Sequence, residues 1–336
     1  MTESKKQTPA EHPLAAQACW ITWEHHRRSR SLTRELKIPL VELAKPGGRA
    51  LRYVRDSWVT LARLLSNRHR TVFVQVPSLV LGHLAITLSS LLRFRVIVDA
   101  HNAVIEGAES GGFPLRMLYR SVVKRADLVI VTNTSLAERV RRLGGRPGVL
   151  PDPVPELESM SEPVASNEVV VISTWATDEP LGAVLEAAQH LPQPLFFTIT
   201  GRPRGPLADA ARATARVRLS GFVSEQEYLA LLSRARVVVD LTTREDCLVC
   251  GAYEALALGR PLVVSDSRAL RELLRDGAVF AKNEPQAVAL AVSEASANEE
   301  KWAAQCAARR EAYREEWRTA AEQLLAQIDA GRFPAP

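Results

Sequence analysis

Cysteine is scarce in this chain. The 336 residues include only four cysteines, which are Cys19, Cys247, Cys250 and Cys306. So few thiols exclude a disulfide framework and favour a reducing compartment. Cys247 and Cys250 have the spacing of half a zinc site, but no second pair exists and no histidine lies near them in the sequence, whereas a structural zinc takes four ligands. We therefore predict no bound metal and no required cofactor, and redox use of the pair at a helix start stays the alternative.

Long apolar runs are also missing. The longest, Ser78 to Leu92, is too short and too interrupted by serine, glycine and histidine to span a bilayer. It predicts a buried helix, with shallow membrane contact as the alternative. The N-terminal stretch MTESKKQTPAEHP has no apolar segment behind its positive charges, so it does not resemble a signal peptide. We expect a cytoplasmic protein.

Two nucleotide-recognition signatures are absent. No G-x-G-x-x-G follows the first apolar run, which reads CWITWEHH, and the stretch AKPGGRALRY does not fit that motif. This absence disfavours a dinucleotide-dependent oxidoreductase or a sugar-nucleotide epimerase. The chain also lacks an aromatic RNA-binding signature and a recognition-helix motif, so we expect no nucleic acid partner.

The charge is distributed unevenly. Residues 1–150 contain 24 lysines and arginines against 11 acidic residues, whereas the remaining residues contain 19 against 27. A basic half indicates an anionic partner, and an anionic membrane leaflet fits. An arginine-rich solvated surface is the simpler interpretation, and a basic nucleic-acid-binding protein is the alternative from another functional class.

Apolar runs rich in valine and isoleucine alternate with stretches of helical periodicity along the whole chain. They fall at 19–23, 39–43, 71–76, 95–100 and 127–132, and then at 168–174, 195–201, 216–222, 236–242, 261–266 and 278–280. Such continuous runs between helices predict parallel sheets covered on both faces. The fold class is therefore α/β, with two doubly wound Rossmann-like domains.

Prolines mark the boundary between the two domains. Pro151, Pro153 and Pro155 can continue neither a helix nor a central strand. We predict a basic N-terminal domain over 1–155, a linker over 156–166 and a second domain over 167–300. The helical tail 301–336 is expected to pack back on the first domain. Ligands of such sheets bind outside the carboxyl ends of the strands, which predicts a site in a cleft between the domains.

The segment 246–266, DCLVCGAYEALALGRPLVVSD, contains the strongest motif. A buried strand precedes it, and a helix begins near Cys250 and Gly251, where unpaired N–H groups and the helix dipole favour a phosphate. Glu254 lies about one turn into this helix, in position to bind a ribose diol. Asp246 lies before the helix and can reach a sugar next to the diphosphate.

The spacing of Asp246 and Glu254 resembles the Glu-x7-Glu pair of the retaining GT-B enzymes of glycosyltransferase family 4. The stretch EALALGRPLVVSD is close to that family's pattern, although aspartate replaces the first glutamate. The resemblance implies a GT-B fold and a uridine diphosphate sugar as donor. It also implies that Glu254 binds the ribose and that Asp246 contacts the transferred sugar.

Further segments resemble the family in order: TITGRP, VRLSGFVSEQEYLALLSRARVVVD, VLPDPV and SDSRALRELL. The second implies that the backbone near Phe222 pairs with the base. The residues expected to bind the donor are Glu254, Gly251, Cys250, Val249, Gly201, Arg202, Phe222, Thr174 and Arg244. The sequence STWATDEPLG departs from the family, because Asp178 and Glu179 stand where basic residues are usual. Arg202, Arg244, the helix N-terminus or a metal would then neutralise the diphosphate.

The first domain has its own candidates for catalysis. His101 follows a buried strand, where an imidazole can position or deprotonate an acceptor or bind a donor hydroxyl. The alternative is a loop histidine bonded to Asp99. If the reaction inverts the anomeric centre, Asp99 and Glu106 are further candidates for the general base.

Two basic segments are candidates for acceptor or membrane contact. The stretch TWEHHRRSR fits an anionic acceptor such as a lipid-linked diphosphate sugar, or equally a solvated basic helix start. The stretch LRMLYRSVVKRAD fits a basic amphipathic helix on an anionic membrane, or an ordinary surface helix. The residues expected to contact acceptor or membrane are Trp23, Glu24, Arg27, Asn102, Glu106, Arg116 and Arg120.

Together these features predict a glycosyltransferase at the inner face of the cell membrane. It would move a hexosyl or glucuronosyl group from a nucleotide sugar to a lipid-linked glycan in exopolysaccharide or cell-surface glycan synthesis. The Asp-x7-Glu spacing favours retention, and an inverting transferase with a first-domain base is the alternative.

Overall fold

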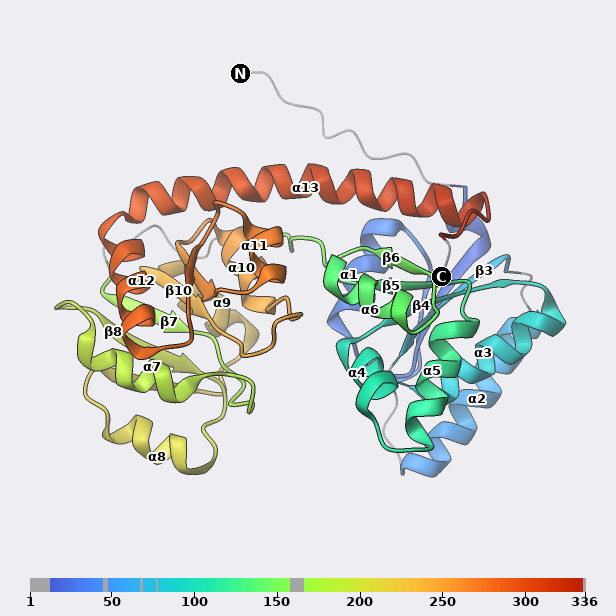
Figure 1. Ribbon diagram of the computed structural model, residues 1–336, viewed down its shortest axis with the longest axis horizontal. Helices are drawn as coiled ribbons and strands as arrows, with labels where there is room; N and C mark the ends of the chain where they lie inside the picture. The colour runs from blue at the N-terminus through green and yellow to red at the C-terminus, as the bar shows by residue number, and fades with distance from the viewer. Residues whose placement is uncertain (1–12, 45–47, 67–68, 77, 158–165, 335–336) are drawn as a thin grey trace, which may run out of the picture. The chain divides into compact units, whose positions relative to one another are not determined.

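The computed structural model describes residues 13–44, 48–66, 69–76, 78–157 and 166–334. The chain divides into two compact units, which we describe separately (Figure 1). The first unit contains Met1–Pro153 and Trp317–Pro336, and the second contains Val154–Glu316. Most of the predicted linker, residues 158–165, lies outside the described residues.

The first unit is built on a six-stranded parallel sheet in the order β2-β1-β3-β4-β5-β6. Its strands are β1 (Ala18–Thr22), β2 (Leu40–Glu42), β3 (Thr71–Val76), β4 (Arg95–Ala100), β5 (Leu128–Val131) and β6 (Pro147–Val149). Its helices are η1 (Ala15–Gln17), α1 (Arg27–Leu36), α2 (Arg49–Ser66), α3 (Leu79–Leu92), α4 (Asn102–Ser110), α5 (Leu115–Arg125) and α6 (Thr134–Arg142). The strand order reverses between β1 and β3, so the loops that leave these strands diverge there.

The second unit repeats the plan, with the strand order β12-β11-β10-β7-β8-β9. Its strands are β7 (Glu168–Val171), β8 (Phe196–Thr200), β9 (Val217–Gly221), β10 (Val237–Asp240), β11 (Leu262–Ser265) and β12 (Val279–Ala281). Its helices are α7 (Leu181–Ala187), η2 (Ala188–His190), α8 (Gly205–Ala213), α9 (Glu225–Arg234), α10 (Cys250–Leu258), α11 (Arg268–Leu274) and α12 (Pro285–Ala297). Here the order reverses between β7 and β10.

The valine and isoleucine runs form the strands, as predicted. Every residue of β3, β5, β7, β10 and β11 is buried, which is the pattern of a sheet covered on both faces. The fold class, two doubly wound α/β domains, is confirmed. Strand β6 was not predicted, because its three residues include a proline and a glycine and give no periodic signal.

One long helix, α13 (Glu299–Asp329), follows α12 and contributes to both units. In the second unit, Arg309 donates from Nε to the carbonyl of Leu273 at 2.8 Å. In the first unit, Arg95 donates from Nη1 to the carbonyl of Ile328 at 2.8 Å, and the indole of Trp317 donates to the carbonyl of Pro151 at 2.9 Å. Over the described part of the chain, no helix combines the length and the hydropathy needed to cross a bilayer.

Candidate functional site

Five of the predicted donor residues of the second unit follow β7 or β10, the strands on either side of its switch point: Thr174, Arg244, Val249, Cys250 and Gly251. The loops after these two strands touch: the Thr243 N–H donates to the carbonyl of Asp178 at 2.7 Å. The Arg244 guanidinium also lies 3.5 Å from the Asp178 carboxylate, and both side chains are partly exposed. The Asp178 carboxylate therefore already neutralises part of the positive charge of Arg244, which was expected to pair with a diphosphate.

The N-terminus of α10 differs from the prediction. The Gly251 N–H does not point to solvent but donates to Oδ2 of Asp240, at the end of β10, at 2.8 Å. The Ala252 N–H donates to the carbonyl of Val249, which is the N-cap residue. The expectation that the Gly251 amide holds a phosphate is therefore wrong, because a buried carboxylate needs a donor and takes this one.

Glycine is required at position 251 for a packing reason. A Cβ there would lie 2.2 Å from Cδ1 of Ile172 and 2.5 Å from Oδ2 of Asp240. Burial raises the pKa of Asp240 well above its usual value, although the hydrogen bond from Gly251 works in the opposite direction. The neighbouring Glu254 and Glu179 raise it further.

Glu254 lies on α10, one turn after Gly251, and is partly buried. The hydroxyl of Tyr228, on α9, donates to Oε2 of Glu254 at 2.5 Å. This bond fixes the carboxylate while its other oxygen can accept further hydrogen bonds. Sequence reasoning missed Tyr228, although it lies in a segment that resembles the family. Asp246 is half-buried in the loop before α10.

The loop after β7 forms a nest of hydrogen-bond donors around one carboxylate. The N–H groups of Thr174, Trp175 and Ala176 donate to Glu179, at 2.9, 2.9 and 3.3 Å. The hydroxyls of Ser173 and Thr174 donate to the same carboxylate at 2.6 and 2.7 Å. Successive N–H groups of this kind bind anions. The Glu179 carboxylate thus accepts hydrogen bonds from five donors at the carboxyl end of β7.

This nest has a strained backbone. Trp175 has a φ of 63°, which side-chain-bearing residues rarely adopt. Its indole donates to the carbonyl of Thr200 at 2.9 Å, which ties the loop to the end of β8. Gly201 follows β8 with a φ of +84°, and a Cβ there would lie 2.2 Å from the Ser173 carbonyl oxygen. The predicted residues Thr174 and Gly201 therefore lie in one packed arrangement.

Arg202 and Phe222 also come together. The Arg202 guanidinium lies 5.1 Å from the centre of the Phe222 ring, a cation–π distance. Phe222 directly follows β9 and is 75% exposed. An exposed aromatic ring with an arginine on it offers a flat surface on which a nucleotide base can stack.

Cys247 and Cys250, in the segment 246–266, do not form a disulfide. Cys247 is half-buried and Cys250 is exposed. Within the described residues, no group of three or more cysteine, histidine, aspartate or glutamate side chains has an arrangement that could hold a metal ion.

In the first unit, a buried ion-pair network lies at the carboxyl end of the sheet. Arg28, on α1, donates to Asp99 at 2.9 Å, to Asp152 at 3.1 Å and to the carbonyl of Leu150 at 2.8 Å. Burial alone would lower the pKa of Arg28, but the two carboxylates more than offset this effect and raise it. Asp99 is only 1% exposed, so this geometry favours a positioning role for Asp99 over that of a general base. The segment TWEHHRRSR contains three arginines, and the sequence alone does not indicate which of them points inward.

His101 caps α4 next to this network. Its Nδ1 accepts from the Ala103 N–H at 3.4 Å, and its ring is exposed and meets the His26 ring edge-on with centroids 6.0 Å apart. The strand-end histidine is therefore accessible, and its Nδ1 serves the N-terminus of α4. Asn102 and Glu106 lie on α4 and are half-buried.

Trp23 is a correction to the predicted acceptor residues. It is 2% exposed, its indole donates to the hydroxyl of Thr60 at 3.1 Å, and its ring packs against Tyr53. Its apolar surface belongs to the core, so it cannot contact an acceptor. Glu24 and Arg27 are exposed at the carboxyl end of β1.

Arg116 and Arg120 lie on α5 and are both half-buried. Arg120 donates from Nε to the carbonyl of Ala108 at 2.8 Å and so joins α5 to α4. The exposed cations of this helix are instead Lys124 and Arg125, near its C-terminal end.

Both halves of the chain match known families. Residues 12–151 match the family described as "Glycosyl transferase 4-like domain", and residues 166–298 match "Glycosyl transferases group 1". Together these matches include most of the chain and correspond closely to the two sheets.

A curated relative matches one segment. A mannosyltransferase of Mycobacterium tuberculosis H37Ra, named GDP-mannose-dependent alpha-(1-6)-phosphatidylinositol dimannoside mannosyltransferase, is 33% identical over 115 residues. This match spans 34% of the chain and 30% of the relative.

Solved structures share the fold over nearly the whole chain. HepE of Anabaena in complex with UDP-glucose has a TM-score of 0.70 at 14% identity, covering 93% of this chain and 91% of that one. Sucrose-phosphate synthase of Thermosynechococcus elongatus has a TM-score of 0.64 at 18% identity, covering 87% and 83%.

Proposed function

We propose that this chain, a glycosyltransferase with the GT-B fold whose two halves match the 4-like and group 1 glycosyl transferase families, transfers a sugar from a nucleotide sugar to a membrane-associated glycan acceptor. The observation that carries this proposal is the arrangement around α10. The nest after β7, the glycine turn after β8 and the Tyr228–Glu254 pair all surround one switch point of a doubly wound sheet.

Different residues of the second unit bind the different parts of the donor. Glu254, fixed by Tyr228, accepts hydrogen bonds from the ribose diol. Phe222 and Arg202 hold the base, and Asp246 contacts the transferred sugar. We propose a uridine diphosphate donor carrying a hexosyl or glucuronosyl group. The name of the mycobacterial relative makes GDP-mannose the competing donor.

The diphosphate needs donors other than the Gly251 amide. We propose that it binds at the nest of residues 173–176 by displacing the Glu179 carboxylate, with Arg202 and Arg244 nearby in the same unit. This arrangement accounts for an acidic residue where related enzymes have a basic one, since the Glu179 carboxylate occupies the nest that we assign to the phosphate.

We propose that the reaction retains the anomeric configuration. The bond from the sugar C1 to the diphosphate oxygen breaks, and the acceptor hydroxyl oxygen bonds to C1 on the same face. The hydroxyl proton passes to the departing phosphate oxygen, so no protein base is consumed. Catalysis then depends on positioning and on stabilising the leaving group's charge. An inverting reaction with His101 as base is the second candidate, because this ring is exposed at a strand end.

The acceptor is proposed to be a lipid-linked glycan of an exopolysaccharide or cell-surface pathway, with the enzyme on the inner face of the cell membrane. Glu24, Arg27, Asn102 and Glu106 of the first unit are the acceptor-side candidates.

Thermal unfolding with UDP, UDP-glucose, UDP-glucuronate, GDP and GDP-mannose tests the donor. A ligand at a hundredfold excess over its Kd stabilises the protein by about 2.7 kcal/mol. The stabilising sugar nucleotide is then incubated with a lipid extract, and the anomeric configuration of the product is read by NMR. If none of the nucleotides shifts the transition, the proposal is wrong, and an inverted product would replace retention with the second candidate.

A further inference from the structure

The exposed large apolar side chains of this protein are concentrated on one part of the first unit. Among the described residues, 14 such side chains are exposed, and only Leu207, Phe222 and Leu290 lie in the second unit. The others lie on three helices of the first unit or next to one of them: Leu51, Val54, Trp58, Val59 and Leu65 on α2, Val80 and Leu91 on α3, and Phe113, Leu115, Met117 and Leu118 at α5. Scattered single residues need no explanation, but a concentration of this kind marks an interaction surface.

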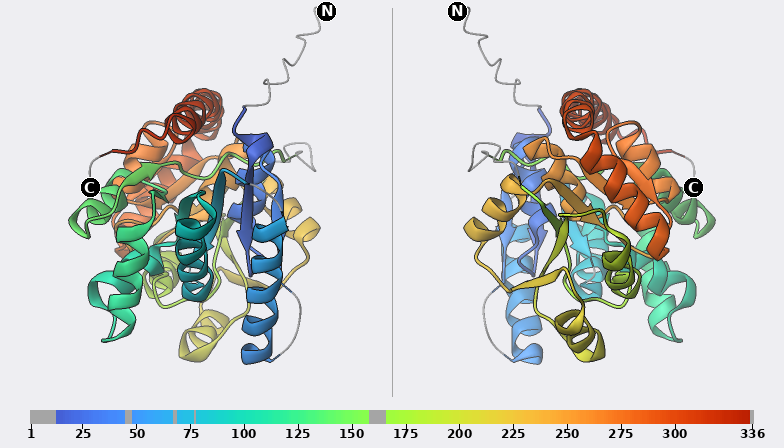
Figure 2. Two further views of the ribbon diagram at one scale, coloured as in Figure 1. Left: turned by 90° about the vertical axis from the view of Figure 1, so that its right-hand side faces the viewer. Right: turned by 90° about the vertical axis from the view of Figure 1, so that its left-hand side faces the viewer.

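The three helices form one continuous layer. Leu64 of α2, Leu81 of α3 and Val122 of α5 belong to the same hydrophobic core, together with alternate residues of β3, β4 and β5. Because alternate residues of a strand share a face, α2, α3 and α5 cover the same face of the sheet. Helix α3 contacts both α2 and α5, and the left view of Figure 2 shows the three helices side by side in the order α2, α3, α5.

Helix α2 carries two apolar stripes. One faces the core through Leu61 and Leu64. The other, Leu51, Val54, Trp58 and Leu65, recurs at the spacing of one helix face and is 57–73% exposed. A surface helix needs only the first stripe in order to fold, so the second has no role in this unit's own core.

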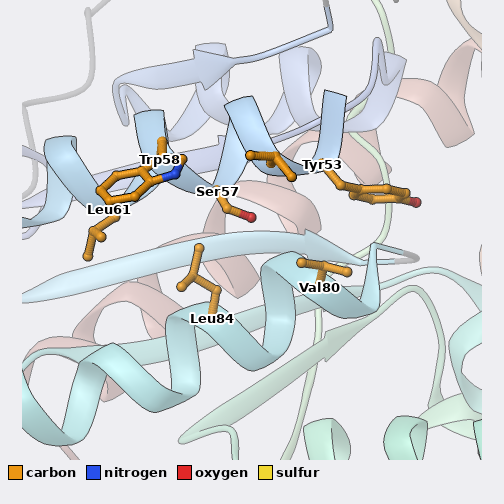
Figure 3. A pocket seen from close by; sticks show the side chains of 7 residues that line it. Tyr53, Ser57, Trp58, Leu61, Val80 and Leu84 are labelled. Carbon is orange, nitrogen blue, oxygen red and sulfur yellow. The ribbon is translucent and has the colours of Figure 1, made fainter. Parts of the chain in front are cut away.

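A groove of about 400 Å³ lies between α2 and α3. Figure 3 shows Tyr53, Trp58 and Leu61 on the α2 side and Val80 and Leu84 on the α3 side. The lining is mostly apolar, with the hydroxyls of Ser57 and Tyr53 and the indole N–H of Trp58 as its polar side-chain groups, which suits a hydrocarbon chain better than a sugar.

The charge on these helices has one sign. Their only acidic residue is Asp56, which is 1% exposed and accepts a hydrogen bond from Arg55. Exposed cations include Arg63 on α2 and both Lys124 and Arg125 on α5. An apolar surface bordered by cations and free of exposed acids complements an anionic bilayer. Two copies of the same basic surface would repel each other, so the charge disfavours a dimer through this face.

We propose that the outer surface of α2, α3 and α5 docks on an anionic lipid bilayer and that the α2–α3 groove accepts an acyl chain. The proposal deepens the proposed function, since it names the surface that brings the enzyme to a membrane-bound acceptor. It also relocates the contact: Trp58 and Leu91, rather than Arg116 and Arg120, enter the lipid.

Co-flotation of the full chain with vesicles tests the surface. We expect binding to vesicles of phosphatidylcholine with phosphatidylglycerol, and much weaker binding to phosphatidylcholine alone or at high salt. Trp58→Ser should weaken binding by roughly tenfold or more, since it removes most of the apolar area that this side chain would bury in the lipid. Leu91→Ser and Leu290→Ser form a matched pair, because these leucines are 74% and 71% exposed on helices of different units. Of these two substitutions, only Leu91→Ser should weaken vesicle binding.

Tryptophan fluorescence tests the groove. Vesicles with brominated acyl chains should quench part of the emission of the wild-type protein, and Trp58→Phe should abolish that part.

Thermal shifts with UDP, measured on the same variants, separate this proposal from the donor proposal, because the substitutions lie outside the donor unit. Unchanged flotation of Trp58→Ser would overturn the docking surface even if nucleotide binding persists. A concentration-dependent dimer that Trp58→Ser dissociates, without vesicle binding, would assign the surface to a second copy.

Discussion

Tyr228 holds Glu254 by a hydrogen bond of 2.5 Å between its hydroxyl and Oε2 of the carboxylate. The two residues are 26 positions apart and lie on different helices, α9 and α10. A carboxylate fixed in this way loses little conformational entropy when a ribose binds.

Tyr228→Phe is therefore expected to weaken UDP binding about tenfold and to raise KM with little change in kcat, because Tyr228 acts only through Glu254. Glu254→Gln should weaken binding at least as much, since the ribose hydroxyls lose a charged acceptor. Calorimetric titration with UDP and steady-state kinetics measure both effects. Tyr119→Phe, on α5 of the first unit, is the control for loss of a hydroxyl. Equal affinity of wild type and Tyr228→Phe would contradict the positioning role.

The proposed function implies that Glu179 competes with a phosphate for the nest after β7. Glu179→Ala vacates three N–H groups and two hydroxyls and removes a negative charge, so we expect UDP and pyrophosphate to bind about tenfold more tightly. Glu186→Ala, on α7, is the control for removing a carboxylate from this unit. Weaker binding by Glu179→Ala, with a lower melting temperature, would instead mean that the carboxylate only holds the loop in shape.

The thiols provide a direct probe of the α10 N-terminus. Burial raises the pKa of Cys19 and of Cys306 to about 12, so these thiols should resist alkylation near pH 8 in the folded protein. Cys250 is exposed at the first position of α10 and should react fastest. Saturating UDP should protect it, as measured by mass spectrometry after a pulse of iodoacetamide. Cys250→Ser should remove the fast phase. Labelling that stays unchanged under UDP, at concentrations that raise the melting temperature, would place the nucleotide away from this helix.

Asp240 makes stability depend on pH in a definite direction. Its folded pKa is raised, chiefly by burial, so above the unfolded value the folded protein holds a proton that the unfolded protein has lost. The stabilisation this provides is complete below about pH 3.9, the unfolded value, and is lost as the pH rises through the folded pKa. Asp240→Asn should therefore reduce the fall in unfolding free energy between about pH 5 and pH 8. Urea unfolding at both pH values measures this difference, with Asp246→Asn as control. Equal slopes in wild type and Asp240→Asn would refute this assignment.

Much of the candidate site was predictable because its signals are local. Glu254 and the start of α10 follow from the spacing of small residues after a valine-rich strand, and Gly201 follows from a glycine at a strand end. Tyr228 and Asp240 carried no such signal, since each acquires its role from a partner on another element.

The sequence by itself determined the two doubly wound sheets, because alternation of apolar runs with helices depends only on residues close together in the chain. Only the tertiary structure decided which polar groups are already satisfied. It buried Trp23, turned Arg28 toward the buried Asp99, gave the Gly251 amide to Asp240 and placed Glu179 in the nest. It also left a second apolar stripe of α2 exposed. The physical reason is that burial and hydrogen bonding depend on what other elements bring to a residue, and a linear pattern does not contain that information.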